Sequence, residues 1–376
     1  MRKTTQYATF ILAASLAAMA QSSAPRVVRV GSEWVEETTG TLAAGKVVRV
    51  KTTAGSIKVQ GGDQSNVTYT IRKRVRARSE EEAHREFALL KINATASGDI
   101  VLLRADGGKS RGSADFDVHA PRGTMVLRLD TDGGAVMAAN ITGQVEANTA
   151  GGAIRVDQIG GVVVIKSGGG DIEVGKTNSD VQVETGGGNI HVVAAGGNVR
   201  ASSGGGDLSI GSGKIMVLDT GGGSIRVAKC TGQIKASTGG GNLDLIDIGG
   251  AAQIESGGGA IHIGPIHGGV RAETGAGAIV ADLTGVRDAF SNSHLETSVG
   301  DIVVYLPDDL RVTVSASVEA ARGKSITSEF SGLVITRSGN TYGPLEVFAR
   351  GSLNGGGPLL HVHTVSGNIE FKHKKK

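Results

Sequence analysis

The chain has 376 residues, of which 60 are Gly and only 6 are Pro. This composition excludes collagen and Pro-rich disorder, which both need far more Pro. Aromatic residues make up 3 % of the chain and apolar residues 39 %, so any core has to be aliphatic. The 39 basic and 36 acidic residues leave a net charge of +3, which gives no overall electrostatic reason to expect nucleic acid as a partner.

Residues 1–20 have the features of a signal peptide. Arg2 and Lys3 precede an apolar stretch from Ala8 to Ala18, and an Ala-Met-Ala cleavage motif ends at Ala20. The apolar stretch is shorter than the roughly 20 residues of a transmembrane helix. We therefore expect cleavage before Gln21, no transmembrane segment in the mature chain, and export to the periplasm, the cell surface or the medium.

Residues 21–130 are predicted to form a β-rich N-terminal cap that contains one helix at about 79–92. Ser79 and Glu82 form a capping box at the start of this helix. Ala83, Phe87 and Leu90 would share one helical face. Before the helix, TTAGSIKV at 52–59 is a degenerate copy of a repeat that dominates the middle of the chain.

The most basic segment is VTYTIRKRVRAR at 67–78, in which apolar and basic side chains alternate. As a strand it would bury the apolar side chains and place four arginines on the opposite face, namely Arg72, Arg74, Arg76 and Arg78. A row of guanidinium groups suits a polymer of phosphates or carboxylates. The simpler interpretation is a solvated edge strand that the acidic residues 80–82 partly neutralise.

A repeat with a period of 18, shortened to 17 at one step, occupies residues 131–286. Its nine copies begin at Thr or Ser and read like TGGGNIHV at 185–192. Counted from that residue, position 6 is always aliphatic, position 7 is mostly polar, and position 8 is apolar. This alternation is typical of a half-buried strand, and a second alternation later in each copy predicts two short strands per repeat.

Such a unit cannot bury its apolar face alone, so successive copies have to stack. We predict an all-β fold, a β-solenoid with 18-residue coils, two strands per coil and parallel ladders. Nine coils at about 4.8 Å each would form a rod about 43 Å long. Along position 7, Arg155 would neighbour Glu173, and Asp244 would lie between Arg226 and His262, so unlike charges would meet on adjacent coils.

Position 4 of the repeat is Gly in every copy, and we predict that it forms a corner with positive φ, which favours glycine. The nine corner glycines are Gly134, Gly152, Gly170, Gly188, Gly206, Gly223, Gly241, Gly259 and Gly277.

Residues 287–371 are predicted to form degenerate coils and a C-terminal cap, followed by a basic tail at 372–376. The ends of a solenoid need caps because they expose unpaired strand edges. Both flanks carry larger core residues than the repeat does, since all the aromatic residues lie outside residues 117–289.

The TxGGxIxV repeats, the stretch YLPDD at 305–309 and the closing TVSGNIEF at 364–371 together resemble a bacterial family named "putative adhesin" domains. The resemblance covers the chain from about residue 26 to residue 371. It implies an extracytoplasmic β-solenoid of unknown function, and it implies no catalytic residues.

Four local patterns suggest sites, and we favour a structural interpretation for each. Calcium-binding Gly-rich repeats need Asp in every unit, but position 5 is Asp only at Asp171 and Asp207. GGKS at 107–110 lacks the first Gly of a phosphate-binding loop. His361 and His363 share a strand face without a predicted third ligand. Cys230, the one cysteine, falls in an inward column. We therefore expect no metal, no cofactor and no disulfide.

The sequence is compatible with two classes of function, a non-enzymatic interaction protein and an enzyme. We favour a non-enzymatic exported module, an adhesin or envelope scaffold that binds an unidentified envelope polymer or protein. An accessory subunit of an envelope signalling or transport complex is the alternative. A carbohydrate-active β-helix enzyme is disfavoured, because the repeat lacks aromatic residues and its outward acids, such as Glu173, Asp244 and Glu273, are scattered in the sequence.

Overall fold

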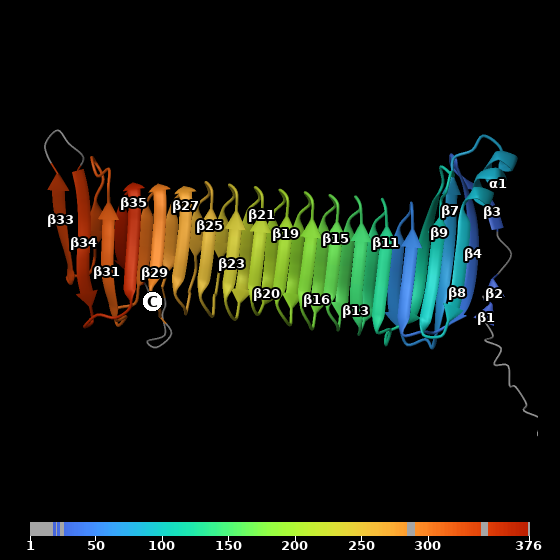
Figure 1. The fold of residues 1–376 in the computed structure, drawn as a ribbon, viewed down its shortest axis with the longest axis horizontal. Coiled ribbons are helices and arrows are strands. Elements are labelled where there is room, and N and C mark those ends of the chain that lie inside the picture. Colours follow the sequence, from blue (N-terminus) through green and yellow to red (C-terminus); the bar gives the residue numbers. More distant parts are fainter. Residues whose placement is uncertain (1–17, 20, 23–25, 284–289, 340–344, 375–376) are drawn as a thin grey trace, which may run out of the picture.

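The structure is a computed structural model that describes residues 18–19, 21–22, 26–283, 290–339 and 345–374. It is an elongated stack of strands that lie across the long axis of the molecule (Figure 1). Two long sheets, here named sheet A and sheet B, face each other, and most neighbouring strands in each sheet are parallel. The predicted all-β solenoid with parallel ladders is confirmed.

Sheet A runs the length of the rod. Its strands, in spatial order, are β1 (Ala18–Met19), β8 (Lys91–Ser97), β9 (Ile100–Asp106), β5 (Val47–Thr52), β11 (Val126–Thr131), β13 (Gln144–Thr149), β15 (Val163–Ser167), β17 (Val181–Thr185), β19 (Val199–Ser203), β21 (Met216–Thr220), β23 (Ile234–Thr238), β25 (Ala252–Ser256), β27 (Val270–Ala276), β29 (Ser293–Val299), β35 (Leu359–Ser366), β31 (Val312–Val318), β34 (Leu345–Leu353) and β33 (Leu333–Gly339).

Sheet B lies opposite. It begins with β2 (Gln21–Ser22) and β3 (Arg26–Val30), which both pair with β4 (Glu33–Ala43). The strands that follow are β7 (Asn66–Val75), β10 (Ser113–Pro121), β6 (Ile57–Gly62), β12 (Val136–Ile141), β14 (Ile154–Ile159), β16 (Ile172–Thr177), β18 (Ile190–Ala195), β20 (Leu208–Gly213), β22 (Ile225–Cys230), β24 (Leu243–Leu245), β26 (Ile261–Ile263), β28 (Ile279–Asp282), β30 (Ile302–Leu306), β36 (Ile369–His373) and β32 (Ile326–Ser328).

The core is a slab of aliphatic side chains between the two sheets. In β18, Ile190 and Val192 are at most 1 % exposed, whereas His191 between them faces solvent. Ile190 pairs with Ile172 on one side and with Leu208 on the other. The period-2 pattern of the repeat therefore points inward as predicted, and every coil adds one layer to each aliphatic ladder.

The prediction of positive φ at position 4 is wrong for all nine corner glycines. Positive φ occurs instead at Gly55 and Gly300, in the outlying copies of the repeat. The nine require Gly because the coils approach closely: a Cβ at any of them would lie 1.8 to 2.4 Å from the carbonyl oxygen of the preceding corner glycine. Position 3 is open, since a Cβ at Gly187 would meet nothing within 4 Å.

A buried hydroxyl fixes each of these corners. The Thr or Ser at position 1 is nearly inaccessible in every copy. Ser203 is typical: its Oγ donates to the carbonyl oxygen of Gly188 on the preceding coil at 2.8 Å and accepts from the N–H of Gly206 in its own coil at 2.9 Å. The hydroxyl thus satisfies two backbone groups that would otherwise lack partners inside the rod.

Both ends of the solenoid contain a coil from a distant part of the sequence. At the N-terminal end, β5 and β6 stack on β11 and β12, so TTAGSIKV at 52–59 continues the ladders of the repeat. At the C-terminal end, β35 lies between β29 and β31, and β36 lies between β30 and β32, all in parallel. Residues 372–373, assigned to the tail in our sequence analysis, belong to β36.

One helix, α1 (Glu80–Leu89), packs over the N-terminal end of the rod (Figure 1). The Oγ of Ser79 accepts from the N–H of Glu82 at 3.2 Å, as the capping box predicts. Ala83 and Phe87 are buried against Val75 of β7.

Most of the predicted signal peptide lies outside the described residues, so its cleavage stays a prediction. The part that is described includes β1, which pairs with β8. In the described part of the chain, no helix has both the length and the apolar character needed to cross a membrane.

Positions 4 and 3 of the repeat should respond differently when a methyl group is added to the glycine. Gly188→Ala would drive Cβ to 2.4 Å from the oxygen of Gly170, so we expect a loss of about 1 to 3 kcal/mol in the free energy of unfolding. Gly187→Ala meets open space and should change it by less than about 0.5 kcal/mol. Urea titration of the two variants measures the difference, and equal midpoints would contradict the close-approach explanation.

Neighbouring serines test the buried hydroxyl in the same way. Ser203→Ala removes both hydrogen bonds of the corner, and we expect it to cost about 1 to 3 kcal/mol because the carbonyl of Gly188 loses this donor inside the rod. Ser202→Ala, on the exposed face of the same strand, is the matched control and should be nearly neutral. Thermal unfolding of both variants measures the two effects. If Ser202→Ala is as destabilised as Ser203→Ala, the stabilising role of the buried hydroxyl is refuted.

Candidate functional site

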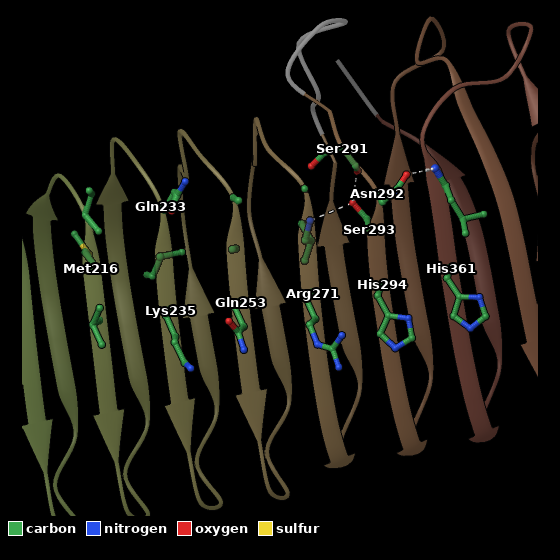
Figure 2. A pocket seen from close by; sticks show the side chains of 18 residues that line it. Met216, Gln233, Lys235, Gln253, Arg271, Ser291, Asn292, Ser293, His294 and His361 are labelled. Atoms are coloured by element: carbon green, nitrogen blue, oxygen red, sulfur yellow. Dashed lines mark hydrogen bonds between the residues drawn. The ribbon is translucent and has the colours of Figure 1, made fainter.

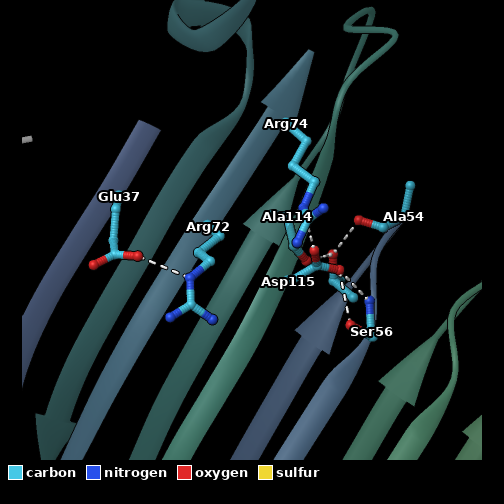
Figure 3. Close-up of polar contacts among 8 residues, drawn as sticks. Glu37, Ala54, Ser56, Arg72, Arg74, Ala114 and Asp115 are labelled. Atoms are coloured by element: carbon cyan, nitrogen blue, oxygen red, sulfur yellow. Dashed lines mark hydrogen bonds and ion pairs between the residues drawn. The ribbon is translucent and has the colours of Figure 1, made fainter. Parts of the chain in front are cut away.

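The basic segment at 67–78 is not an edge strand, because β7 lies between β4 and β10. Arg72 contacts Glu37 of β4 and Arg74 contacts Asp115 of β10, both at 2.8 Å (Figure 3). Arg76 lies 3.2 Å from Glu33. These acids neutralise most of the segment, whereas the sequence analysis assigned that role to residues 80–82.

The four arginines also do not form a single row on one strand. Because β7 ends at Val75, only Arg72 and Arg74 lie on it, and Arg76 and Arg78 follow in the connection to α1. The inward Lys73 is the most enclosed cation of the segment: its Nζ lies 2.7 Å from Glu36 and donates to the carbonyl of Phe87 in α1. Much of this charge therefore holds the cap together.

A second set of polar residues follows the outer face of sheet A toward its C-terminal end. The register of β19 to β35 aligns two rows, each with one residue per strand. The row that we name the basic row contains Arg200, Val217, Lys235, Gln253, Arg271, His294 and His361. The row two residues further along each strand, the acidic row, contains Ser202, Asp219, Ser237, Glu255, Glu273, Glu296 and His363.

A groove of about 810 Å³ borders the basic row and crosses the strands from β21 to β35. Figure 2 shows Lys235, Gln253, Arg271, His294 and His361 side by side along it. Residues 291–293 form part of its wall. Asn292 and Ser293 anchor that wall through hydrogen bonds from the backbone N–H groups of Leu359 and Val270.

Side chains of the two rows pair within β25, β27 and β29. The amide of Gln253 donates to Glu255 at 2.8 Å, Arg271 contacts Glu273 at 2.5 Å, and the Nε2 of His294 lies 2.8 Å from Glu296. The same Nε2 is 3.8 Å from Glu273. Glu273, His294 and Glu296 thereby bring one potential ligand atom each within 4.8 Å of one another.

The ring of His361 stacks on the ring of His294, with centroids 5.0 Å apart and planes 2° from parallel. Burial lowers the pKa of His361 below its usual range, and the neighbouring His294 and His363 lower it further. His363 lies 2.9 Å from Ser317 Oγ and 3.6 Å from Glu319. Of the two histidines singled out in the sequence, His363 thus has a carboxylate neighbour that its own strand does not reveal.

Sequence reasoning missed this cluster because two irregularities create it. The step from Thr274 to Thr297 is longer than the period of the repeat, so the repeat does not align Glu273 with Glu296. His361 is distant from His294 in the sequence and reaches it only because β35 inserts beside β29. The expectation that the outward acids are scattered is therefore wrong for Glu273.

The other sequence patterns have structural roles. The carboxylates of Asp171 and Asp207 accept backbone N–H groups of the next coil at 2.7 Å. Cys230 is buried, and burial raises the pKa of its thiol. GGKS at 107–110 lies in a turn.

The predicted pairs of unlike charges at position 7 are also present, on the outer face of sheet B. Arg155 lies 2.8 Å from Glu173. Asp244 contacts both Arg226, at 3.5 Å, and His262, at 2.9 Å.

Comparison with known proteins identifies no family for the chain. No family model matches, and no curated protein matches. Among solved structures, a "putative cell adhesion protein" from Clostridium sporogenes aligns over 95 % of this chain and 100 % of its own, with 9 % identity and a TM-score of 0.19. A "putative adhesin" from Bacteroides fragilis aligns over 90 % and 97 %, with 10 % identity and a TM-score of 0.25. Scores this low carry no argument about function.

Proposed function

We propose that the chain is an exported, non-enzymatic binding module, an adhesin or envelope scaffold, and that sheet A binds an acidic polysaccharide. The observation that carries the proposal is the groove beside the basic row. It crosses the strands from β21 to β35, so a ligand that fills it lies along the rod rather than in a closed pocket. That shape fits a segment of an extended polymer.

The chemistry of the groove is both cationic and apolar. Lys235 and Arg271 are exposed two strands apart, which places them about 9.6 Å from each other along the rod. Ile215 and Leu359 line opposite ends of the groove and are 49 % and 42 % exposed. Sugar rings offer apolar C–H faces together with carboxylates, and this combination matches the groove better than a purely ionic chain does.

The residues that line the groove also favour binding over turnover. None of the described lining residues is Phe, Tyr or Trp, and stacking platforms of that kind support sugars during cleavage. The carboxylates of Glu255, Glu273 and Glu296 lie in the acidic row, where each has a neighbour in the basic row. Export is inferred from the signal-peptide features of residues 1–20.

Retention of polygalacturonate by immobilised mature protein tests the proposal. We expect binding at low salt and release near 1 M NaCl, because the Debye length falls from about 10 Å at 0.1 M to about 3 Å at 1 M. The double variant Lys235→Ser, Arg271→Ser should bind at least about tenfold more weakly, a change of about 1.4 kcal/mol.

Two comparison variants locate the surface. Lys58→Ser, Arg226→Ser removes the same charge from the outer face of sheet B and should retain binding. The replacement of Arg72, Arg74, Arg76 and Arg78 by Ser should also retain binding, because none of these residues lines the groove. Loss of binding only in this last variant would place the binding site in the N-terminal cap. Shortening of the polymer with time would favour a carbohydrate-active enzyme instead of a binding module.

A further inference from the structure

Three glutamates lie in register on neighbouring strands of sheet A: Glu255 on β25, Glu273 on β27 and Glu296 on β29. Like charges directly opposite each other destabilise a sheet. Arg271 offsets part of the repulsion through its contact with Glu273. A cation bound between Glu273 and Glu296 would remove more of it.

An imidazole completes the arrangement. His294 Nε2 faces both carboxylates, at 2.8 Å from Glu296 and 3.8 Å from Glu273. All three side chains are partly exposed, so they can turn toward an ion that replaces these direct contacts. The stacked ring of His361 supports the plane of the His294 ring from the next strand.

We infer that Glu273, His294 and Glu296 form a binding site for a divalent transition-metal ion, with Zn²⁺ as the best match. One imidazole nitrogen and two carboxylate oxygens are ligands that Zn²⁺ accepts. Ca²⁺ fits less well, because it takes six to eight oxygen ligands. Three protein ligands leave a coordination position open toward solvent, where a carboxylate or water can bind.

The opposite face of the rod supplies a matched comparison. On sheet B, Asp244 lies between Arg226 and His262 in one row across three strands, with the histidine ring 2.9 Å from the acid. The next residue in that row is Val280, so this pair has no second carboxylate there. Within the described residues, the group on sheet A is the one that brings three such ligands together.

Titration calorimetry with ZnCl₂ on the mature, untagged chain tests the inference without any polymer, so its result is independent of the proposed function. We expect one Zn²⁺ per chain. His294→Gln and Glu296→Gln should each weaken binding at least about tenfold, and His262→Gln should leave it unchanged. Zn²⁺ should raise the melting temperature of the wild type and of His262→Gln but not of Glu296→Gln.

Because all three ligands are at the surface, the variants should fold, and Glu296→Gln, which removes one of the opposed charges, should melt no lower than the wild type in the absence of metal. This separates loss of the site from loss of the fold. Three results would overturn the inference: no Zn²⁺ bound by the wild type, equal binding by a triple variant that carries Gln at Glu273, His294 and Glu296, or Ca²⁺ binding as tight as Zn²⁺ binding.

Discussion

The close contact between successive glycine corners governs the whole rod. The carbonyl oxygen of each corner lies where a side chain of the next corner would be, and the same oxygen accepts the buried hydroxyl of the next coil, as Gly188 accepts Ser203. One oxygen thus sets both the approach of the coils and their alignment. With the register held at every turn, the aliphatic ladders of the nine repeats pack without aromatic side chains, and the outward positions are left unconstrained by the core.

Those outward positions hold the charged and polar side chains that can bind a ligand. A strict repeat places each residue beside its counterpart in the next coil. Outward residues at the same repeat position therefore form a row on the surface. The rows of sheet A include their histidine and glutamate cluster only where the repeat lengthens, between Thr274 and Thr297. The same segment supplies Asn292 and Ser293 to the groove wall, and the insertion of β35 beside β29 adds His361.

Most of the fold could be predicted from the sequence because its determinants are local and periodic. Ile190 pointing inward, the capping box at Ser79 and the pair of Arg155 with Glu173 follow from spacing alone. The reason for glycine at position 4 could not be predicted, because a close approach between coils leaves the same sequence signal as a positive φ. The cluster around His294 was also hidden, since it depends on the insertion of a strand from a distant part of the sequence.

The insertion of β35 and β36 also orders the assembly of the chain in time. The coil formed by β29 and β30 has its outer neighbours only in residues 359–373, near the end of the sequence. A chain emerging from its N-terminus can add coils one after another up to that point, but β31 and β32 then have no partner on the growing rod. The rod stays open at β29 and β30 until residues 359–373 are available, so the strand next in sequence does not cover this edge.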